Sequence, residues 1–435
     1  MRAYEGVFTM RSRFTRLAAM PLVAGLALAG CSKADGGGGD SAGGEGVEAG
    51  ATMEEYQAAF EEVEPIELNF QVASPNPEAA ASLRDRQLAE SLEEWSGGKI
   101  TVNIHYAGAV AAPTEVPAAL VDGRLDMAHY YTTYEPQEMP GFVDMTTSMV
   151  QVPSTPLVGE IVTHAALQEV SFGTPEIMEE FASRGLHVIN PANPGGNISM
   201  VCADERASAE DFSGAQIRGN AASHKTEVEA LGGTITSIEL AEGYEAFQRG
   251  ILDCSLQSPA TALAVGWLEV APNVYFPQEQ SFAPGPGSLV AGSSWEQLPL
   301  VAQQLIFDRQ REYTSAEFFN ALEAVRETSD AATAAGGSAQ YLDAESEAAL
   351  TGANETLLAG LEDSENLDGA ALNAAVKESI DKWTAVSEEL GYTDDGGFED
   401  FSSWYQGSED FEDREYLQAI SDRMFEEIIL PQRPS

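Results

Sequence analysis

The residue best placed for chemistry is an arginine at the end of a predicted strand. Arg218 ends the strand expected over 216–219, and a helix is expected to begin a few residues later, at 223. The N-terminus of a helix adds partial positive charge, and a guanidinium binds a carboxylate with two hydrogen bonds. The chain has only 22 Lys+Arg against 70 Asp+Glu. The position of Arg218 therefore predicts a clamp for a carboxylate.

The elements around Arg218 predict a parallel α/β unit. Hydrophobic periodicity and the glycines at 232–233 and 250 divide this part of the chain into alternating strands and helices: 216–219, 223–231, 234–237, 241–249 and 251–256. The connections are too long for hairpins and suit parallel crossovers. Because ligands bind at the carboxyl ends of parallel strands, Arg218 is expected to face a ligand.

Three motifs in this unit resemble the core of TRAP-type solute-binding proteins, the receptors of tripartite ATP-independent periplasmic transporters. They are Gly214-Ala-Gln-Ile-Arg218, Tyr244-Glu-Ala-Phe-Gln-Arg-Gly250 and Leu252-Asp253. The resemblance covers roughly residues 66–330. The sequence departs from the family pattern at Cys254, where the family has glycine, and at Gln257, where it has asparagine.

The resemblance implies an α/β, two-lobed periplasmic-binding-protein-like fold with a central ligand cleft and a long connecting helix. It also implies that Gln257 bonds the ligand, and that Tyr131 faces the cleft from the end of a lobe I strand. Ser199 stands where the family has a second arginine. After the first strand, Ser74 and Asn76 are hydrogen-bonding candidates, with loop capping as the alternative. By strand alternation, only one of Tyr130 and Tyr131 can point inward.

The first half of the chain repeats this layout. Strands are expected over 66–72, 100–106 and 127–131, with helices over 78–95 and 115–122 between them. The motif Gly123-Arg-Leu-Asp126 mirrors Gly250-Ile-Leu-Asp253 at the junction between a helix and a strand. Two similar α/β lobes imply a cleft between them.

The N-terminus has the form of a lipoprotein export signal. Arg11, Arg13 and Arg16 precede an apolar run over 17–29, which is too short for an ordinary membrane span, and Leu28-Ala-Gly-Cys31 has the form of a lipobox. Cys31 is therefore the expected lipid attachment site, with a coincidental small-residue cleavage site as the alternative.

The expected domain order runs from this signal through a tether to the two lobes. The ranges are 1–31, signal peptide; 32–63, flexible Gly-rich acidic tether; 64–196, first part of lobe I; 197–300, lobe II; and 301–435, the connecting helix with C-terminal helices returning to lobe I.

Two cysteines remain once Cys31 is lipidated. Cys202 and Cys254 are an even pair in an oxidising compartment, on strands that are expected to be neighbours. A disulfide between them and two buried free thiols are both compatible with the sequence.

Composition and motifs narrow the function classes. The net charge of −48 argues against nucleic acid and anionic lipid as partners. The five histidines show no metal-ligand spacing, and no cofactor or metal motif is evident. The only nucleophile motif, Gly39-Asp-Ser41-Ala-Gly43, lies in the low-complexity tether, without the strand and helix that a catalytic serine needs.

We therefore expect an extracytoplasmic, lipid-anchored receptor, a monomer, that captures a small organic carboxylate and delivers it to the membrane permease subunits of a TRAP transporter. A C4-dicarboxylate or another organic acid would fit. An exported cleft enzyme and a sensory ligand-binding lipoprotein are the alternatives.

Overall fold

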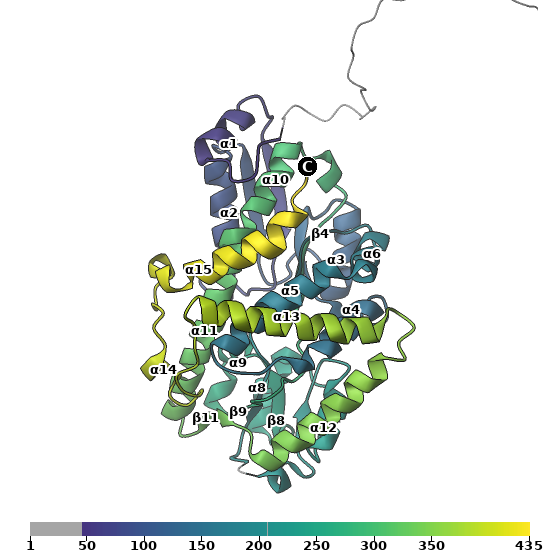
Figure 1. Cartoon of the computed structure of the whole chain (residues 1–435), viewed down its shortest axis with the longest axis vertical. Coiled ribbons are helices and arrows are strands. Elements are labelled where there is room, and N and C mark those ends of the chain that lie inside the picture. Colours follow the sequence, from purple (N-terminus) through teal and green to yellow (C-terminus); the bar gives the residue numbers. More distant parts are fainter. Residues whose placement is uncertain (1–45, 207) are drawn as a thin grey trace, which may run out of the picture. The chain divides into compact units, whose positions relative to one another are not determined.

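The computed structural model describes residues 46–206 and 208–435, so the expected signal peptide and Cys31 lie outside the described residues. Two sheets organise this part of the chain (Figure 1). We call the first sheet with its helices lobe I and the second sheet with its helices lobe II. The mixed α/β architecture and the long connecting helix agree with the expected fold class.

The sheet of lobe I has the strand order β2-β1-β3-β10-β4. Its strands are β1 (Ile66–Gln71), β2 (Ile100–His105), β3 (Met127–Tyr130), β4 (His187–Asn193) and β10 (Gly287–Ala291). Strand β1 is parallel to β2 and β3, whereas β10 runs antiparallel to both β3 and β4. The carboxyl ends of β1, β3 and β4 therefore lie at one edge of this sheet.

The sheet of lobe II has the strand order β11-β9-β5-β8-β6-β7. Its strands are β5 (Ser199–Cys202), β6 (Gln216–Arg218), β7 (Thr234–Thr236), β8 (Cys254–Gln257), β9 (Asn273–Phe276) and β11 (Ser338–Tyr341). Strand β6 pairs in parallel with β7 and β8, as the alternating pattern predicts. Strand β5 is antiparallel to β8, and this register places Cys202 opposite Cys254. The structure joins the two cysteines by a disulfide.

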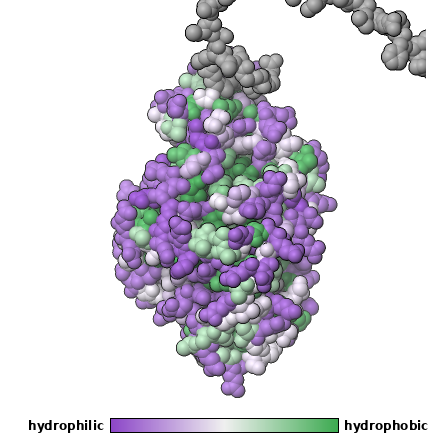
Figure 2. Space-filling view, turned by 45° about the vertical axis from the view of Figure 1, so that its right-hand side comes forward, coloured by the Kyte–Doolittle hydropathy of each residue, from purple (hydrophilic) through white to green (hydrophobic). Residues whose placement is uncertain are grey.

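Helices cover both sheets and connect them. They are α1 (Met53–Phe60), α2 (Leu83–Trp95), α3 (Val116–Val121), α4 (Pro140–Ser148), α5 (Val158–Gly173), α6 (Pro175–Ser183), α7 (His224–Ala230), α8 (Gly243–Gln248), α9 (Pro259–Ala264), α10 (Leu300–Asp308), α11 (Gln310–Ala334), α12 (Ala344–Leu361), α13 (Gly369–Glu389), α14 (Phe401–Trp404) and α15 (Glu415–Met424). None of the described helices is long and apolar enough to cross a bilayer. Figure 2 shows hydrophilic residues over most of the visible face, in keeping with the acidic composition.

Four segments join the two lobes, one of them being α12, which follows β11 of lobe II and contacts both α7 of lobe II and α4 of lobe I. Residues 194–198 lead from β4 to β5, residues 277–286 lead from β9 back to β10, and helix α11 contacts α2 of lobe I as well as β11 of lobe II. The first crossing contains Gly195 and Gly196, which both have positive φ angles that favour glycine. Any relative movement of the lobes must be absorbed by these connections.

Three details differ from the expected domain ranges. Strand β10 was counted with lobe II but inserts into the lobe I sheet, and β11 was counted with lobe I but extends the lobe II sheet. The expected tether also ends earlier than residue 63. Thr52 and Glu55 form a capping box that starts α1, and the helix buries Tyr56 and Phe60.

Residues 391–413, which had no sequence-based role, pack their aromatic side chains against lobe II and α11. The ring of Phe398 stacks on Phe276 of β9 and meets Tyr341 of β11, while Phe411 meets Phe319 of α11. Strand β11 is an edge strand of its sheet. This segment therefore covers aromatic side chains of β9, β11 and α11.

Candidate functional site

The predicted site residues lie at two strand edges, one in each lobe. Ser74 and Tyr131 follow the carboxyl ends of β1 and β3 in lobe I. Arg218 and Gln257 end β6 and β8 in lobe II, and Ser199 begins the antiparallel β5 at the same edge. The topology thus gathers the candidates within each lobe where α/β proteins bind ligands.

Arg218 is buried in lobe II, with only 7% of its surface exposed. Its Nε donates to the carbonyl of Ile238 at 2.7 Å, and its guanidinium lies 5.6 Å from the ring centre of the buried Trp267. Among the described residues, no carboxylate forms an ion pair with Arg218, and its buried Nη1 has no hydrogen-bond partner.

The electrostatics of Arg218 reflect this burial. Desolvation lowers the pKa of the guanidinium, although Tyr134 and Glu239 act in the opposite direction. A buried cation without an anionic partner is costly for a protein unless a ligand supplies the missing charge. Helix α7 has only seven residues, so Arg218 carries the full positive charge at this strand end and the helix terminus at most a partial one.

Gln257 and Ser199 are neighbours in the sheet. The hydroxyl of Ser199 donates to the backbone carbonyl of Gln257 at 2.9 Å. The side-chain Oε1 of Gln257 accepts from the backbone N–H of Ser258 at 3.0 Å. Both residues are buried, so in this conformation Ser199 serves the β5–β8 pairing, and Gln257 presents a polar group at the strand end.

The two tyrosines that end β3 point to opposite sides. Tyr130 is fully buried and packs edge-on against Phe181, away from the site edge. Tyr131 is only partly buried, with its ring near His129 and Tyr134. Strand alternation thus leaves Tyr131 as the tyrosine on the side of the polar network described next, and burial raises the pKa of its phenol.

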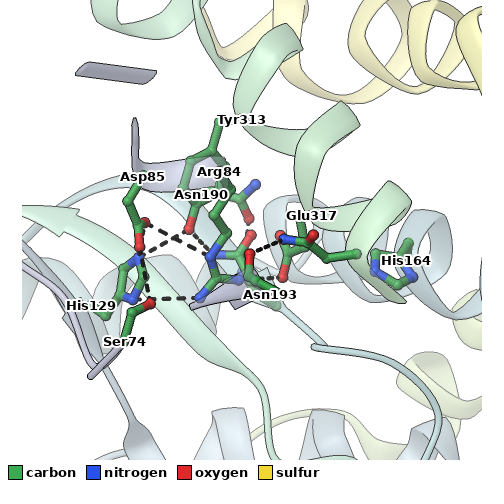
Figure 3. A network of polar contacts seen from close by, with 12 residues as sticks. Ser74, Arg84, Asp85, His129, His164, Asn190, Asn193, Tyr313 and Glu317 are labelled. Carbon is green, nitrogen blue, oxygen red and sulfur yellow. Dashed lines mark hydrogen bonds and ion pairs between the residues drawn. The ribbon is translucent and has the colours of Figure 1, made fainter. Parts of the chain in front are cut away.

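Ser74 belongs to a buried polar network at the lobe I edge (Figure 3). Its hydroxyl donates to Asp85 at 3.3 Å, and the other oxygen of Asp85 lies 3.0 Å from Nε2 of His129. That nitrogen also lies 3.1 Å from the hydroxyl of Tyr313. Asn76 instead caps its own loop by accepting from the N–H groups of residues 78 and 79.

The charged centre of this network is an ion pair that the sequence did not reveal. Arg84 of α2 donates to Glu317 of α11 at 2.6 Å, and its guanidinium lies 5.4 Å from the ring centre of Tyr313 (Figure 3). Burial raises the pKa of Glu317 to about 7, while Arg84 acts to lower it. The sequence could have indicated only one member of this network. Side chains alternate between the two faces of a strand, so His129 lies on the same face of β3 as Tyr131.

A buried carboxyl holds the first crossing between the lobes. Glu160, in the first turn of α5, accepts the backbone N–H of Asn197 at 2.8 Å and is fully buried. Thr163 donates to the side chain of Asn197 at 2.7 Å. Burial raises the pKa of Glu160 to about 8, and burial lowers the pKa of His164, one turn further on, to about 4. Both groups are therefore neutral at pH 7.

Replacing Glu160 by glutamine should remove a loss of stability that the wild type shows as the pH rises from 4.5 to about 8. A raised pKa contributes stability that is fully present below the unfolded value of 4.5 and is lost as the pH rises through about 8. The loss is at most about 1.4 kcal/mol per pH unit for one proton. Urea denaturation between pH 6 and pH 9 should show Glu160→Gln gaining stability relative to wild type as the pH rises.

The exposed Glu179 on α6 offers a matched control, because Glu179→Gln changes the same group in water. Its difference from wild type should stay constant across the pH range. A constant difference for Glu160→Gln as well would contradict the assignment of a protonated carboxyl at the crossing.

A family comparison settles the class of the protein. Residues 73–363 match the model of the bacterial extracellular solute-binding proteins, family 7, known as DctP. The chain belongs to this family. It is thus a TRAP-type solute-binding receptor, as the sequence motifs indicated, and receptors of this type act outside the cytoplasm, bind small ligands and deliver them to a membrane permease. No curated protein matches the sequence significantly.

Solved structures of similar fold come from several bacteria. A TRAP solute-binding protein from Rhodoferax ferrireducens in complex with copurified benzoate has a TM-score of 0.63 and 16% identity, and the match covers 74% of this chain and 99% of that one. DctP7 of Bordetella pertussis, which binds pyroglutamic acid, has a TM-score of 0.59 and 18% identity, and the match covers 72% of this chain and 99% of that one. A TRAP solute-binding protein from Desulfovibrio desulfuricans with bound sn-glycerol-3-phosphate has a TM-score of 0.61 and 16% identity, and the match covers 72% of this chain and 97% of that one. These likenesses support the two-lobed fold of this receptor.

The described residues of the receptor offer groups for recognition of an anion. Within residues 46–206 and 208–435, no group of three His, Cys, Asp or Glu side chains is arranged to hold a metal ion. Arg218 supplies positive charge with a free N–H group, while Gln257 and Tyr131 supply neutral polar groups from the two lobes. Groups of these kinds can hydrogen-bond the carboxylate and other polar atoms of a small acid.

Proposed function

We propose that this receptor captures a small organic acid between the strand ends of its two lobes, with the carboxylate bound by Arg218. The observation that carries the proposal is the buried guanidinium, whose Nη1 has no partner among the described residues. A ligand carboxylate would supply both the missing charge and the missing acceptor. Gln257 and Ser199 of lobe II and Tyr131 and Ser74 of lobe I are proposed to line the rest of the site.

The ligands of the structural neighbours support an acid. Pyroglutamic acid, benzoate and sn-glycerol-3-phosphate, as bound by those proteins, are all anions at neutral pH. Ser199 occupies the position of the family's second arginine, so lobe II offers a single guanidinium at this edge. One guanidinium suits one carboxylate, and we therefore place monocarboxylates ahead of C4-dicarboxylates.

We also propose how the receptor works at the membrane. A ligand that contacts both lobes favours their closed arrangement, because only a difference in affinity between two states shifts their equilibrium. The closed form would then deliver the acid to the permease subunits. The lipobox supports attachment through an acylated Cys31, which a lipid-modified N-terminal peptide in the mass spectrum would verify. We assign binding and no catalytic step to the site, in line with the family.

A thermal-shift screen tests the function. Residues 32–435 would be heated with benzoate, pyroglutamate, galacturonate, glycerol 3-phosphate and a series of mono- and dicarboxylates. An acid at 100 times its Kd should stabilise the folded state by about 2.7 kcal/mol. Benzyl alcohol and 2-pyrrolidinone, which lack the carboxylates of benzoate and pyroglutamate, are the matched controls. Equal stabilisation by these neutral compounds, or none by any acid, would contradict the proposal.

A further inference from the structure

In the second crossing between the lobes, segment 277–286, both the N–H and the carbonyl of Ala283 are hydrogen-bonded to side chains of α7. The N–H of Ala283 donates to Oε1 of Glu227 at 2.9 Å, and the carbonyl of Ala283 lies 2.9 Å from Nε2 of His224. Glu227 and His224 are one turn apart on α7, and both are fully buried. Helix α7 of lobe II therefore fixes the position of the crossing segment 277–286 at this point.

The other ring nitrogen of His224 holds the loop that follows Arg218. Nδ1 accepts the backbone N–H groups of Asn220 at 3.1 Å and Ala221 at 3.2 Å. The ring can come this close because the residue after Arg218 is a glycine: a Cβ added at Gly219 would lie 3.0 Å from Nδ1. Since Nδ1 accepts, Nε2 must carry the proton and donate to Ala283.

The protonation state of His224 fits this double role. Burial lowers the pKa of its ring to about 4, and the nearby Arg218 acts in the same direction. The ring is therefore neutral at pH 7, which is the form that has one donor and one acceptor. A single side chain thus joins the loop after Arg218 to the second crossing.

The crossing segment continues from this point to the lobe I side of the site. A Cβ added at Gly285 would lie 3.3 Å from Thr133 of lobe I and 3.9 Å from Asn220 of lobe II. A Cβ added at Gly287 would lie 2.8 Å from the ring of Tyr131. The segment 283–287 therefore passes from the backbone behind Arg218 to the face of Tyr131, in close contact with both.

We propose that His224 is a positioning residue of the ligand site, which couples the second crossing to Arg218, so that closure of the lobes sets the placement of the guanidinium. This inference rests on the proposed role of Arg218 in binding an acid. Movement of the lobes changes backbone angles in the crossing segment, and Ala283 transmits the change to the ring of His224. The ring in turn is bonded to the two peptide groups that follow Gly219.

Two substitutions each remove one of the two hydrogen-bonding roles of the His224 ring and keep the other. His224→Asn places an amide oxygen near the position of Nδ1, so it keeps an acceptor for the loop and loses the donor to Ala283. His224→Gln reaches the position of Nε2, so it keeps the donor and loses the acceptor. If His224 couples the two segments, each variant should weaken binding at least about 10-fold, because each breaks the link at one end. His187→Asn is the control, since His187 is partly exposed and begins β4, at the opposite end of the strand from the ligand edge.

Calorimetric titration with the acid that gives the largest shift in the thermal screen would measure the Kd of each variant. A side chain that only stabilises the fold would lower the Tm of both variants and leave the Kd of the folded protein unchanged. Wild-type Kd values in His224→Asn and His224→Gln, together with lost binding in Arg218→Ala, would overturn this inference and leave the proposed function intact. Wild-type binding by Arg218→Ala, or no binding by any acid, would overturn both.

A measurement on wild-type protein covers the case in which the variants do not fold. In protein labelled with ¹⁵N-histidine, the His224 ring should show the Nε2–H tautomer, and its signals should shift when the acid is added. The His187 signals should not change. Ring signals of His224 that stay fixed at saturating acid would overturn the coupling.

Discussion

Arg218→Ala should lower the affinity for the bound acid at least about 100-fold. Hydrogen bonds between charged partners contribute roughly 1.5–3 kcal/mol each, and about 1.4 kcal/mol corresponds to a factor of ten in Kd. The guanidinium is buried, so the bond to a carboxylate is not weakened by competing water. Loss of the cation would also leave the ligand carboxylate buried without a counter-charge. Calorimetric titration of wild type and variant would measure the difference.

The same substitution should leave the ligand-free protein as stable as wild type, within about 1 kcal/mol. The Arg218→Ala variant lacks the hydrogen bond from Nε to the carbonyl of Ile238 and the contact of the guanidinium with the Trp267 ring. It also removes a buried cation with an unpartnered Nη1, which is a cost to the ligand-free fold. These two effects oppose each other. A separation of affinity from stability is typical of a side chain kept for binding.

Arg206 offers the matched control, because it is a largely buried arginine of lobe II that, unlike Arg218, is paired with a carboxylate of the protein. Its guanidinium pairs with Asp253 at 3.1 Å and bonds the carbonyl of Asp211. Arg206→Ala should therefore lower the Tm and leave the Kd unchanged. Unchanged affinity in Arg218→Ala, or equal losses of affinity in both variants, would contradict the assignment of Arg218.

Reduction of the disulfide between Cys202 and Cys254 should lower the free energy of unfolding by about 4 kcal/mol. The two cysteines are 52 residues apart in sequence, and closing a loop of this length restricts the unfolded chain by about that amount. Because the cysteines face each other across β5 and β8, the bond also pins the two strands that carry Ser199 and Gln257. Urea denaturation with and without reductant would measure the effect.

The control for this prediction is a chain in which both cysteines are serine, whose stability should not respond to reductant. In a Cys31→Ser chain, denatured without reductant, no thiol should react with a thiol reagent. Two reactive thiols per chain would show that the disulfide does not form.

Local patterns in the sequence were enough to place Arg218. Periodicity, together with glycines at the helix ends, locates β6, α7, β7, α8 and β8 to within a few residues, because each element buries one face of its own segment. Parallel pairing followed from the length of the connections. Once the strands are parallel, the residue that ends β6 has to lie at the ligand edge.

The lobe I network could not be predicted in this way. The pair of Arg84 and Glu317 joins residues 233 positions apart, on two helices whose packing no local pattern determines. The insertion of strand β10 between β3 and β4 likewise depends on the path of the whole chain. Helix α1, by contrast, could have been predicted, because Thr52 and Glu55 form a capping box at its start. The expected tether was extended over this helix because the residues before it are rich in glycine.

The most direct test of the account is a crystal structure of the receptor with the acid selected by the thermal screen. We predict a carboxylate oxygen within hydrogen-bonding distance of Nη1 of Arg218, a buried atom without a partner in the protein, and further contacts to Gln257 and Tyr131. An acid bound elsewhere, or bound between the lobes with its carboxylate away from Arg218, would contradict the assignment of Arg218.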